Sequence, residues 1–210
     1  MGNNSIQALR NIAPVMAKCL VFAPRQHIIL LSDLWQLHIE CEHAFNAATE
    51  PLLASMRLQW LHDALDTAQP PHGHELLLRL SAYHDRAGFI RIIEVWQQSL
   101  QHAGLSAQSL RERCYADCFI EMARICGIAQ TADADALVRQ IGISMAQSSA
   151  GLAIQTDILH QQIIRQCGKD TGWLLAVNEI VKRARNNDVA SDNLLIFKLF
   201  WQIIVANISA

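Results

Sequence analysis

The feature that most constrains the fold is the spacing of the apolar side chains, which recur three and four residues apart along the chain. This spacing gathers apolar residues on one face of an α-helix, whereas a half-buried strand needs strict alternation. No run of alternating β-branched residues is present, and all five prolines lie at or before Pro71, so none interrupts the longer part of the chain that follows. We therefore predict an all-α protein.

Prolines and glycines divide the pattern into about eight helices, because proline opens a helix and glycine ends one. No internal repeat or low-complexity segment is present, and 210 residues suffice for one domain with a sizeable core, so we predict a single domain over residues 1–210. The expected helices cover residues 5–21 (interrupted near Pro14), 26–47, 51–67, 74–86, 88–102, 107–126, 133–166 (bent near Gly142 or Gly151), 171–186 and 190–208.

The composition argues against disorder and against a nucleic-acid partner. Hydrophobic residues make up 51% of the chain and charged residues only 17%, while the formal net charge is -2 with both signs interspersed. The start of the chain has no basic region followed by an apolar core, so no signal peptide is expected. The six cysteines form no Cys-x-x-Cys pair and are expected to be reduced and buried in a cytoplasmic protein.

The last expected helix, residues 190–208, is strongly apolar. It is shorter than the roughly 20 apolar residues of a membrane span and contains Lys198 and Gln202, so no transmembrane helix is expected. Two interpretations remain for it. It closes the core, or it presents an apolar surface to a partner or to the face of a membrane.

The densest polar cluster in an apolar helix lies at residues 38–43. His38 and Glu42 are four residues apart and Glu40 and His43 three apart, so each pair shares a helix face. Glu-x-x-His is also half of a di-iron site in helical bundles, but no second copy exists in the chain. The alternative is a partly solvated helix face that holds a Glu/His network.

A second polar group lies in the expected helix 51–67. Arg57, Gln59, Trp60 and Asp63 interrupt an otherwise apolar sequence. Charged and amide side chains are unfavourable in such a helix unless they have a partner, so they are candidate binding residues.

Four segments resemble parts of the squalene/phytoene synthase family, the all-helical enzymes that join two prenyl diphosphates head to head. The likeness covers residues 16–166 best and implies an isoprenoid-synthase-type bundle with helices around a central cavity. The segments are residues 22–37, which begin Phe-Ala-Pro; residues 50–65, with Glu-Pro-Leu-Leu and Arg-Leu-Gln-Trp-Leu-His-Asp-Ala-Leu; Tyr115 with Ile-Cys-Gly-Ile at 125–128; and Gly-Leu-Ala-Ile-Gln-Thr-Asp-Ile-Leu-His at 151–160.

Family enzymes ionise a prenyl diphosphate with Mg²⁺ held between two Asp-rich motifs, and Mg²⁺ prefers hard carboxylate oxygens. The first motif aligns with residues 42–46 and the second with Gln162 and Gln166, so most acids are lost. Glu42 and Asp157 are weak metal candidates, and no catalytic residue is assigned. The resemblance implies these candidates for a diphosphate or ligand cavity: Glu40, Glu42, His43, Asn46, Arg57, Trp60 and Asp157.

Loss of the acidic motifs implies a catalytically degenerate relative that needs no cofactor and binds a protein partner or an isoprenoid- or lipid-like ligand. The chain is more similar to the phytoene-synthase-like branch that includes a mitochondrial complex I assembly factor, which implies a role in respiratory complex assembly. Residues 166–172 stand where the family has a longer basic loop, so the domain is shortened after about residue 166. The alternative is an active Mg²⁺-dependent prenyltransferase of isoprenoid biosynthesis.

Overall fold

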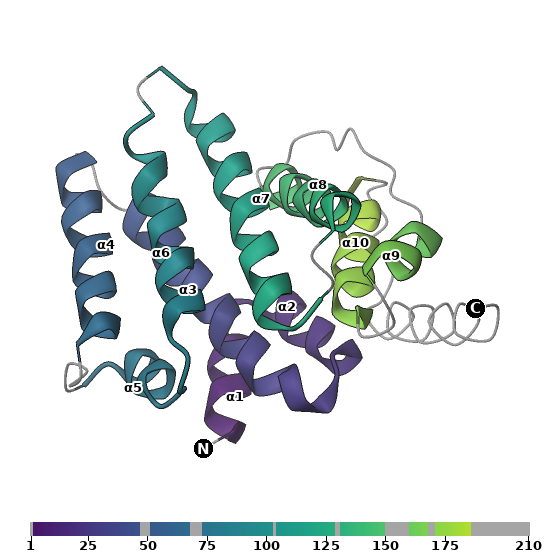
Figure 1. The fold of residues 1–210 in the computed structure, drawn as a ribbon, viewed down its shortest axis with the longest axis horizontal. Helices are drawn as coiled ribbons and strands as arrows, with labels where there is room; N and C mark the ends of the chain where they lie inside the picture. The colour runs from purple at the N-terminus through teal and green to yellow at the C-terminus, as the bar shows by residue number, and fades with distance from the viewer. Residues whose placement is uncertain are drawn as a thin grey trace.

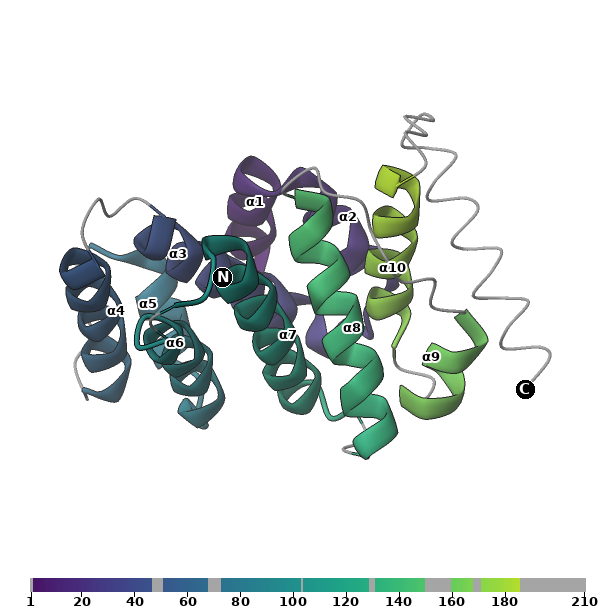
Figure 2. The ribbon, with the colours of Figure 1, turned by 90° about the horizontal axis from the view of Figure 1, so that it is seen from above.

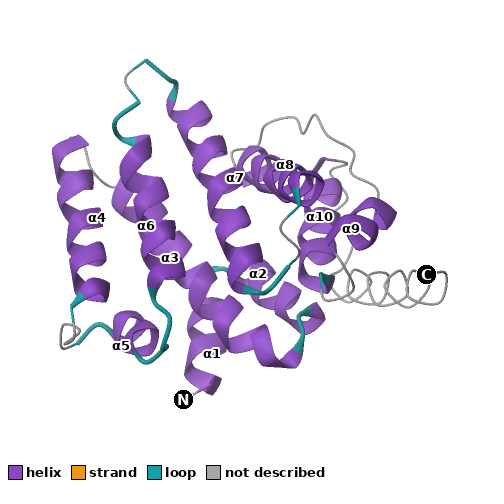
Figure 3. Ribbon diagram, viewed as in Figure 1, coloured by secondary structure: helices purple, strands orange, loops and turns teal. Residues whose placement is uncertain are grey.

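The computed structural model describes residues 2–46, 51–67, 73–102, 104–128, 131–149, 160–167 and 171–185, and everything structural below concerns these residues. They form α-helices and two short 3₁₀ turns, with no strand among them (Figure 3). The all-α prediction is confirmed. The helices are α1 (Gly2–Ile12), α2 (Pro14–Cys19), α3 (Ile28–Asn46), α4 (Pro51–Asp66), α5 (Glu75–Ser81), α6 (Ala87–Ser99), α7 (Ala107–Ile125), α8 (Ala132–Ser149), α9 (His160–Cys167) and α10 (Gly172–Arg185), with 3₁₀ turns η1 (Leu20–Phe22) and η2 (Arg25–His27) between α2 and α3.

The helices are arranged as a row in which α4, α6, α7, α8 and α10 each pack against the next (Figures 1 and 2). Helix α4 lies at one end of this row, and α9 and α10 lie toward the other. Helix α3 packs against α1, α4, α5, α6 and α7, and is therefore the helix on which the first half of the fold is assembled.

Most predicted boundaries agree with the structure to within a few residues, two predictions differ from it at least in part, and one is not tested. Helix α8 continues through Gly142 without a break, and the other expected bend, near Gly151, lies outside the described residues. The helix expected at 74–86 ends at Ser81. The helix expected at 190–208 also lies outside the described residues, and no helix in the described part is long and apolar enough to cross a membrane.

The core is rich in sulfur and indole side chains. All six cysteines are buried free thiols, as expected from the sequence. Burial disfavours the thiolate and raises the pKa of Cys126 to about 12 and that of Cys167 to about 11. Trp35, Trp96 and Trp173 are also buried.

Gly142 allows α7 and α8 to approach each other closely. A Cβ atom at this position would lie 2.6 Å from the Tyr115 carbonyl oxygen and 2.9 Å from the Ala116 Cα, both in the α7 backbone. Gly88 at the α6–α7 contact is different, because its Cβ would meet side-chain atoms, of Ile125 and Arg91, and no backbone. The α7–α8 contact therefore fixes the backbone beside Tyr115.

We predict that Gly142→Ala lowers the free energy of unfolding by about 1–3 kcal/mol, since a backbone clash cannot be relieved by a rotamer change. This loss outweighs the gain of roughly 1 kcal/mol that alanine brings to a helix. Urea unfolding followed by circular dichroism measures it. Gly88→Ala is the matched comparison and should cost clearly less; an equal or smaller loss for Gly142→Ala would contradict the close approach.

Candidate functional site

Helix α3 carries the polar cluster predicted from the sequence, and its residues divide between two faces. His38 and Glu42 are buried, whereas His43 and Asn46 are exposed. Glu40 is partly exposed and points to α5, where its Oε1 lies 3.6 Å from His74 Nε2. The expectation of a partly solvated Glu/His network is therefore wrong for the His38–Glu42 pair, which faces the core.

Glu42 is held by two residues of α7. The Tyr115 hydroxyl donates a hydrogen bond of 2.8 Å to Oε2. Arg111 Nη2 lies 2.5 Å from Oε1 and forms an ion pair with it. The Arg111 guanidinium also lies over the Tyr115 ring, 5.5 Å from its centroid. Burial of Tyr115 and the neighbouring Glu42 carboxylate raise the pKa of Tyr115 well above its usual value, so the phenol stays a donor.

His38 is enclosed by aromatic rings. Its ring centroid lies 4.4 Å from that of Tyr115, 5.5 Å from Trp96 and 5.9 Å from Trp35. Neither ring nitrogen has a hydrogen-bond partner among the described residues. Desolvation lowers the pKa of His38 to about 4, against the opposing attraction of Glu42, so the ring is neutral at physiological pH.

The two candidates on α4 lie apart from this cluster. Arg57 and Trp60 are exposed on the outer surface, and the Trp60 ring contacts the His74 ring in a tilted arrangement with the ring centroids 5.7 Å apart. Trp60 is 48% exposed, unlike the buried Trp35, Trp96 and Trp173. Gln59 and Asp63 form a surface hydrogen bond of 2.7 Å, and Gln97 of α6 donates to Gln59.

The seven candidates therefore do not form one site in the described structure. Only Glu42 faces the core, Glu40 and Trp60 both reach His74, and His43, Asn46 and Arg57 are exposed. Asp157 lies outside the described residues. No group of three or more His, Cys, Asp or Glu side chains within the described ranges is placed to hold a metal ion.

Sequence reasoning missed Arg111, the residue that balances the Glu42 charge. The signal was present, because Arg111 and Tyr115 are four residues apart and so share a face of α7 with the buried Cys118. A cation and a phenol on an otherwise buried helix face indicate a buried acid opposite them.

A second buried acid, Asp33, ties α3 to α1 and α5. It accepts hydrogen bonds from Ser5 Oγ at 2.7 Å, Arg79 Nε at 2.9 Å and the Tyr83 hydroxyl at 3.2 Å. Gln36 bridges Ser5 and Arg79 beside it. Because all these polar groups are paired with one another, this network reads as structural.

Comparison with known proteins adds no name. No family model, curated protein or solved structure matches the chain. Fold and site together define an all-helical protein of about ten helices with a buried, charge-balanced glutamate, and they identify no family.

We predict that the neutral His38 makes the protein acid-sensitive. Its folded pKa lies below the unfolded value of 6.5, so the unfolded chain binds more protons between pH 6.5 and 4. Its contribution is complete above pH 6.5 and falls by about 3 kcal/mol as the pH drops to 4. Urea unfolding across this range measures the slope.

His38→Leu should flatten that slope, because the leucine side chain does not titrate. The exposed His43→Leu is the matched control and should leave the slope unchanged. If both variants keep the wild-type slope, the acid sensitivity does not come from His38.

Proposed function

We propose that this chain is a squalene/phytoene synthase-like protein that has lost prenyl transfer and binds an isoprenoid- or lipid-like ligand or an apolar partner. The single observation that carries this proposal is the pairing of Glu42 with Arg111 and Tyr115. We also propose a role in respiratory complex assembly, and this part of the proposal rests on the family resemblance alone.

The charges around Glu42 support a binding role over metal-dependent catalysis. Ionisation of a prenyl diphosphate needs several carboxylates to hold Mg²⁺. The Glu42 charge is already offset by Arg111, and a guanidinium 2.5 Å away would repel a divalent cation at the same oxygen. Trp35, Trp96 and Tyr115 fill the space beside His38, where a ligand cavity would have to open.

The outer face of α4 supports contact with an apolar partner. Leu52, Met56 and Trp60 are spaced four residues apart and so lie on one face, with Leu53 beside them. Their exposed fractions are 67%, 60%, 48% and 45%, in the order Leu52, Met56, Trp60 and Leu53. Leucine, methionine and tryptophan on one face, next to the exposed Arg57, fit the interfacial region of a lipid surface.

The first test is a titration with farnesyl diphosphate with and without Mg²⁺, following binding heat and diphosphate release. We expect no diphosphate release that depends on Mg²⁺, because one charge-balanced glutamate cannot hold the ion. Mg²⁺-dependent release would support the prenyltransferase alternative and refute the loss of catalysis.

The same proposal predicts sedimentation with phosphatidylcholine vesicles through α4. Replacing two exposed apolar side chains, in Met56→Ser/Trp60→Ser, should weaken vesicle binding at least roughly tenfold through the lost apolar area. The matched control Ser109→Ala/Arg113→Gln changes the surface of α7 and should bind like the wild type. No vesicle binding by the wild-type protein would remove the lipid surface as the partner.

A further inference from the structure

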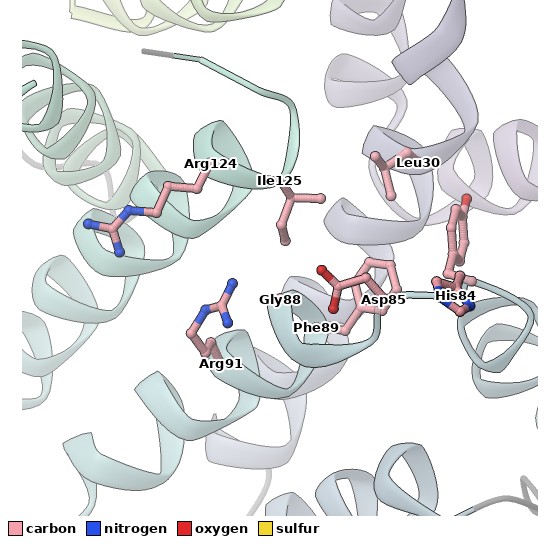
Figure 4. A pocket seen from close by; sticks show the side chains of 9 residues that line it. Leu30, His84, Asp85, Gly88, Phe89, Arg91, Arg124 and Ile125 are labelled. Atoms are coloured by element: carbon pink, nitrogen blue, oxygen red, sulfur yellow. The ribbon is translucent and has the colours of Figure 1, made fainter. Parts of the chain in front are cut away.

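A cavity of about 640 Å³ opens beside the start of α6, away from the Glu42 cluster (Figure 4). Leu30 of α3, Phe89 of α6 and Ile125 of α7 give it an apolar wall. Asp85 contributes a carboxylate, and Arg91 and Arg124 contribute guanidinium groups. None of the six candidates that lie in the described ranges lines it.

Arg91 is fixed so that part of its guanidinium stays open to the cavity. Its Nε donates to Glu121 Oε2 at 2.7 Å, and Glu121 is held from the other side by Arg124 Nη1 at 2.6 Å. Arg91 Nη2 is turned toward Gly88, 3.7 Å from where a Cβ of that residue would lie. No partner of the two Nη groups is present in the described part of the chain, so they are oriented but unused. Arg124 extends away from Gly88 (Figure 4).

Asp85 faces the same space with one oxygen already engaged. Its Oδ1 accepts a hydrogen bond of 3.0 Å from the Ala87 N–H, which fixes the carboxylate at the start of α6. The sequence interpretation of residues 84–86 as the end of a helix is thus wrong, since Asp85 serves the helix that follows. Asp85 and Arg91 point toward the space beside Gly88 (Figure 4), yet they form no ion pair with each other in the described structure.

Asp85 and Arg91 hold opposite charges apart in a cavity with an apolar wall. A ligand that carries both a positive and a negative charge would be complementary to them. The planar guanidinium suits a carboxylate or phosphate. The carboxylate of Asp85 suits an ammonium. A lone anion would be repelled by Asp85 and a lone cation by Arg91.

We propose that this cavity binds a small zwitterion with an apolar substituent, its oxyanion on Arg91, its ammonium on Asp85 and its apolar part against Leu30, Phe89 and Ile125. Two kinds of molecule share this chemistry: a free apolar amino acid, and a phospholipid whose phosphoethanolamine head group carries both charges. The site shares no residue with the Glu42 cluster, so it stands or falls separately from the proposed function.

The test is isothermal titration of the full chain with L-leucine and with dihexanoylphosphatidylethanolamine. At least one of them should bind, and which one binds identifies the source of the zwitterion. Analogues that lack one of the two charges serve as controls. N-acetyl-leucine lacks the ammonium of leucine, and leucine methyl ester lacks its carboxylate. Dihexanoylphosphatidic acid lacks the ammonium of the phosphatidylethanolamine. Each should bind more weakly than its parent. Absence of binding by both parents, or equal binding by the single-charge analogues, would overturn the proposal.

Variants locate the site. Arg91→Gln should weaken binding at least roughly tenfold, because the ligand's oxyanion loses a charge-assisted hydrogen bond. Asp85→Asn keeps an oxygen that can accept from the Ala87 N–H but loses the charge, and should weaken binding about fivefold because the carboxylate is exposed. Arg113→Gln is the matched control, since Arg113 is similarly exposed and pairs with Asp117 on α7. Unfolding midpoints are measured for all three variants. Wild-type affinity in both folded site variants would refute the assignment.

Discussion

The contact between Glu42 and the pair Arg111 and Tyr115 joins the central helix α3 to α7, and much of the arrangement depends on it. An ionised carboxylate in a core is unfavourable unless a cation and hydrogen-bond donors compensate it. Tyr115 donates to one oxygen and Arg111 lies against the other. The register of α7 against α3 is therefore specified by charge as well as by apolar packing.

Two further sets of contacts hold α7 and α3 in place: one between α7 and α8, and one between α3 and helices α1 and α5. Gly142 brings the α8 backbone against α7 at Tyr115, so the tyrosine cannot move away without separating the two helices. On the other side of α3, the Asp33 network binds α1 and α5 through Ser5 and Arg79. Helix α3 thus presents two buried acids to opposite neighbours, and each acid has its own cation. This division explains why the polar residues of α3 do not converge on one metal site.

Local pattern was enough to predict most of the fold. The spacing of apolar residues and the positions of prolines and glycines indicated helices close to those observed, because both signals act within one or two turns. A bend was expected near Gly142 or Gly151. Helix α8 is continuous at Gly142 because that glycine serves the close contact with α7, and Gly151 lies outside the described residues.

The candidate site was predicted less well, because it depends on contacts between residues that lie far apart in the sequence. Glu42 was singled out correctly as unusual, yet its partners lie some seventy residues later on α7, as the Tyr115 hydrogen bond shows. Trp60 was named as a candidate for a ligand cavity, but α4 lies at the end of the row and no described element covers its outer face. Which face of an end helix is covered follows from topology, and the spacing of its residues does not encode it.

The central claim is that Glu42 is a charge-balanced structural acid and not a remnant of a metal site. A double-mutant cycle of Glu42→Gln and Arg111→Met, measured by urea unfolding at neutral pH, tests it most directly. Arg111→Met alone leaves a buried charge unpaired, so the double variant should be about 2 kcal/mol more stable than the sum of the two losses predicts. Losses that add to within roughly 0.5 kcal/mol would show that the two charges do not depend on each other, and would contradict the account.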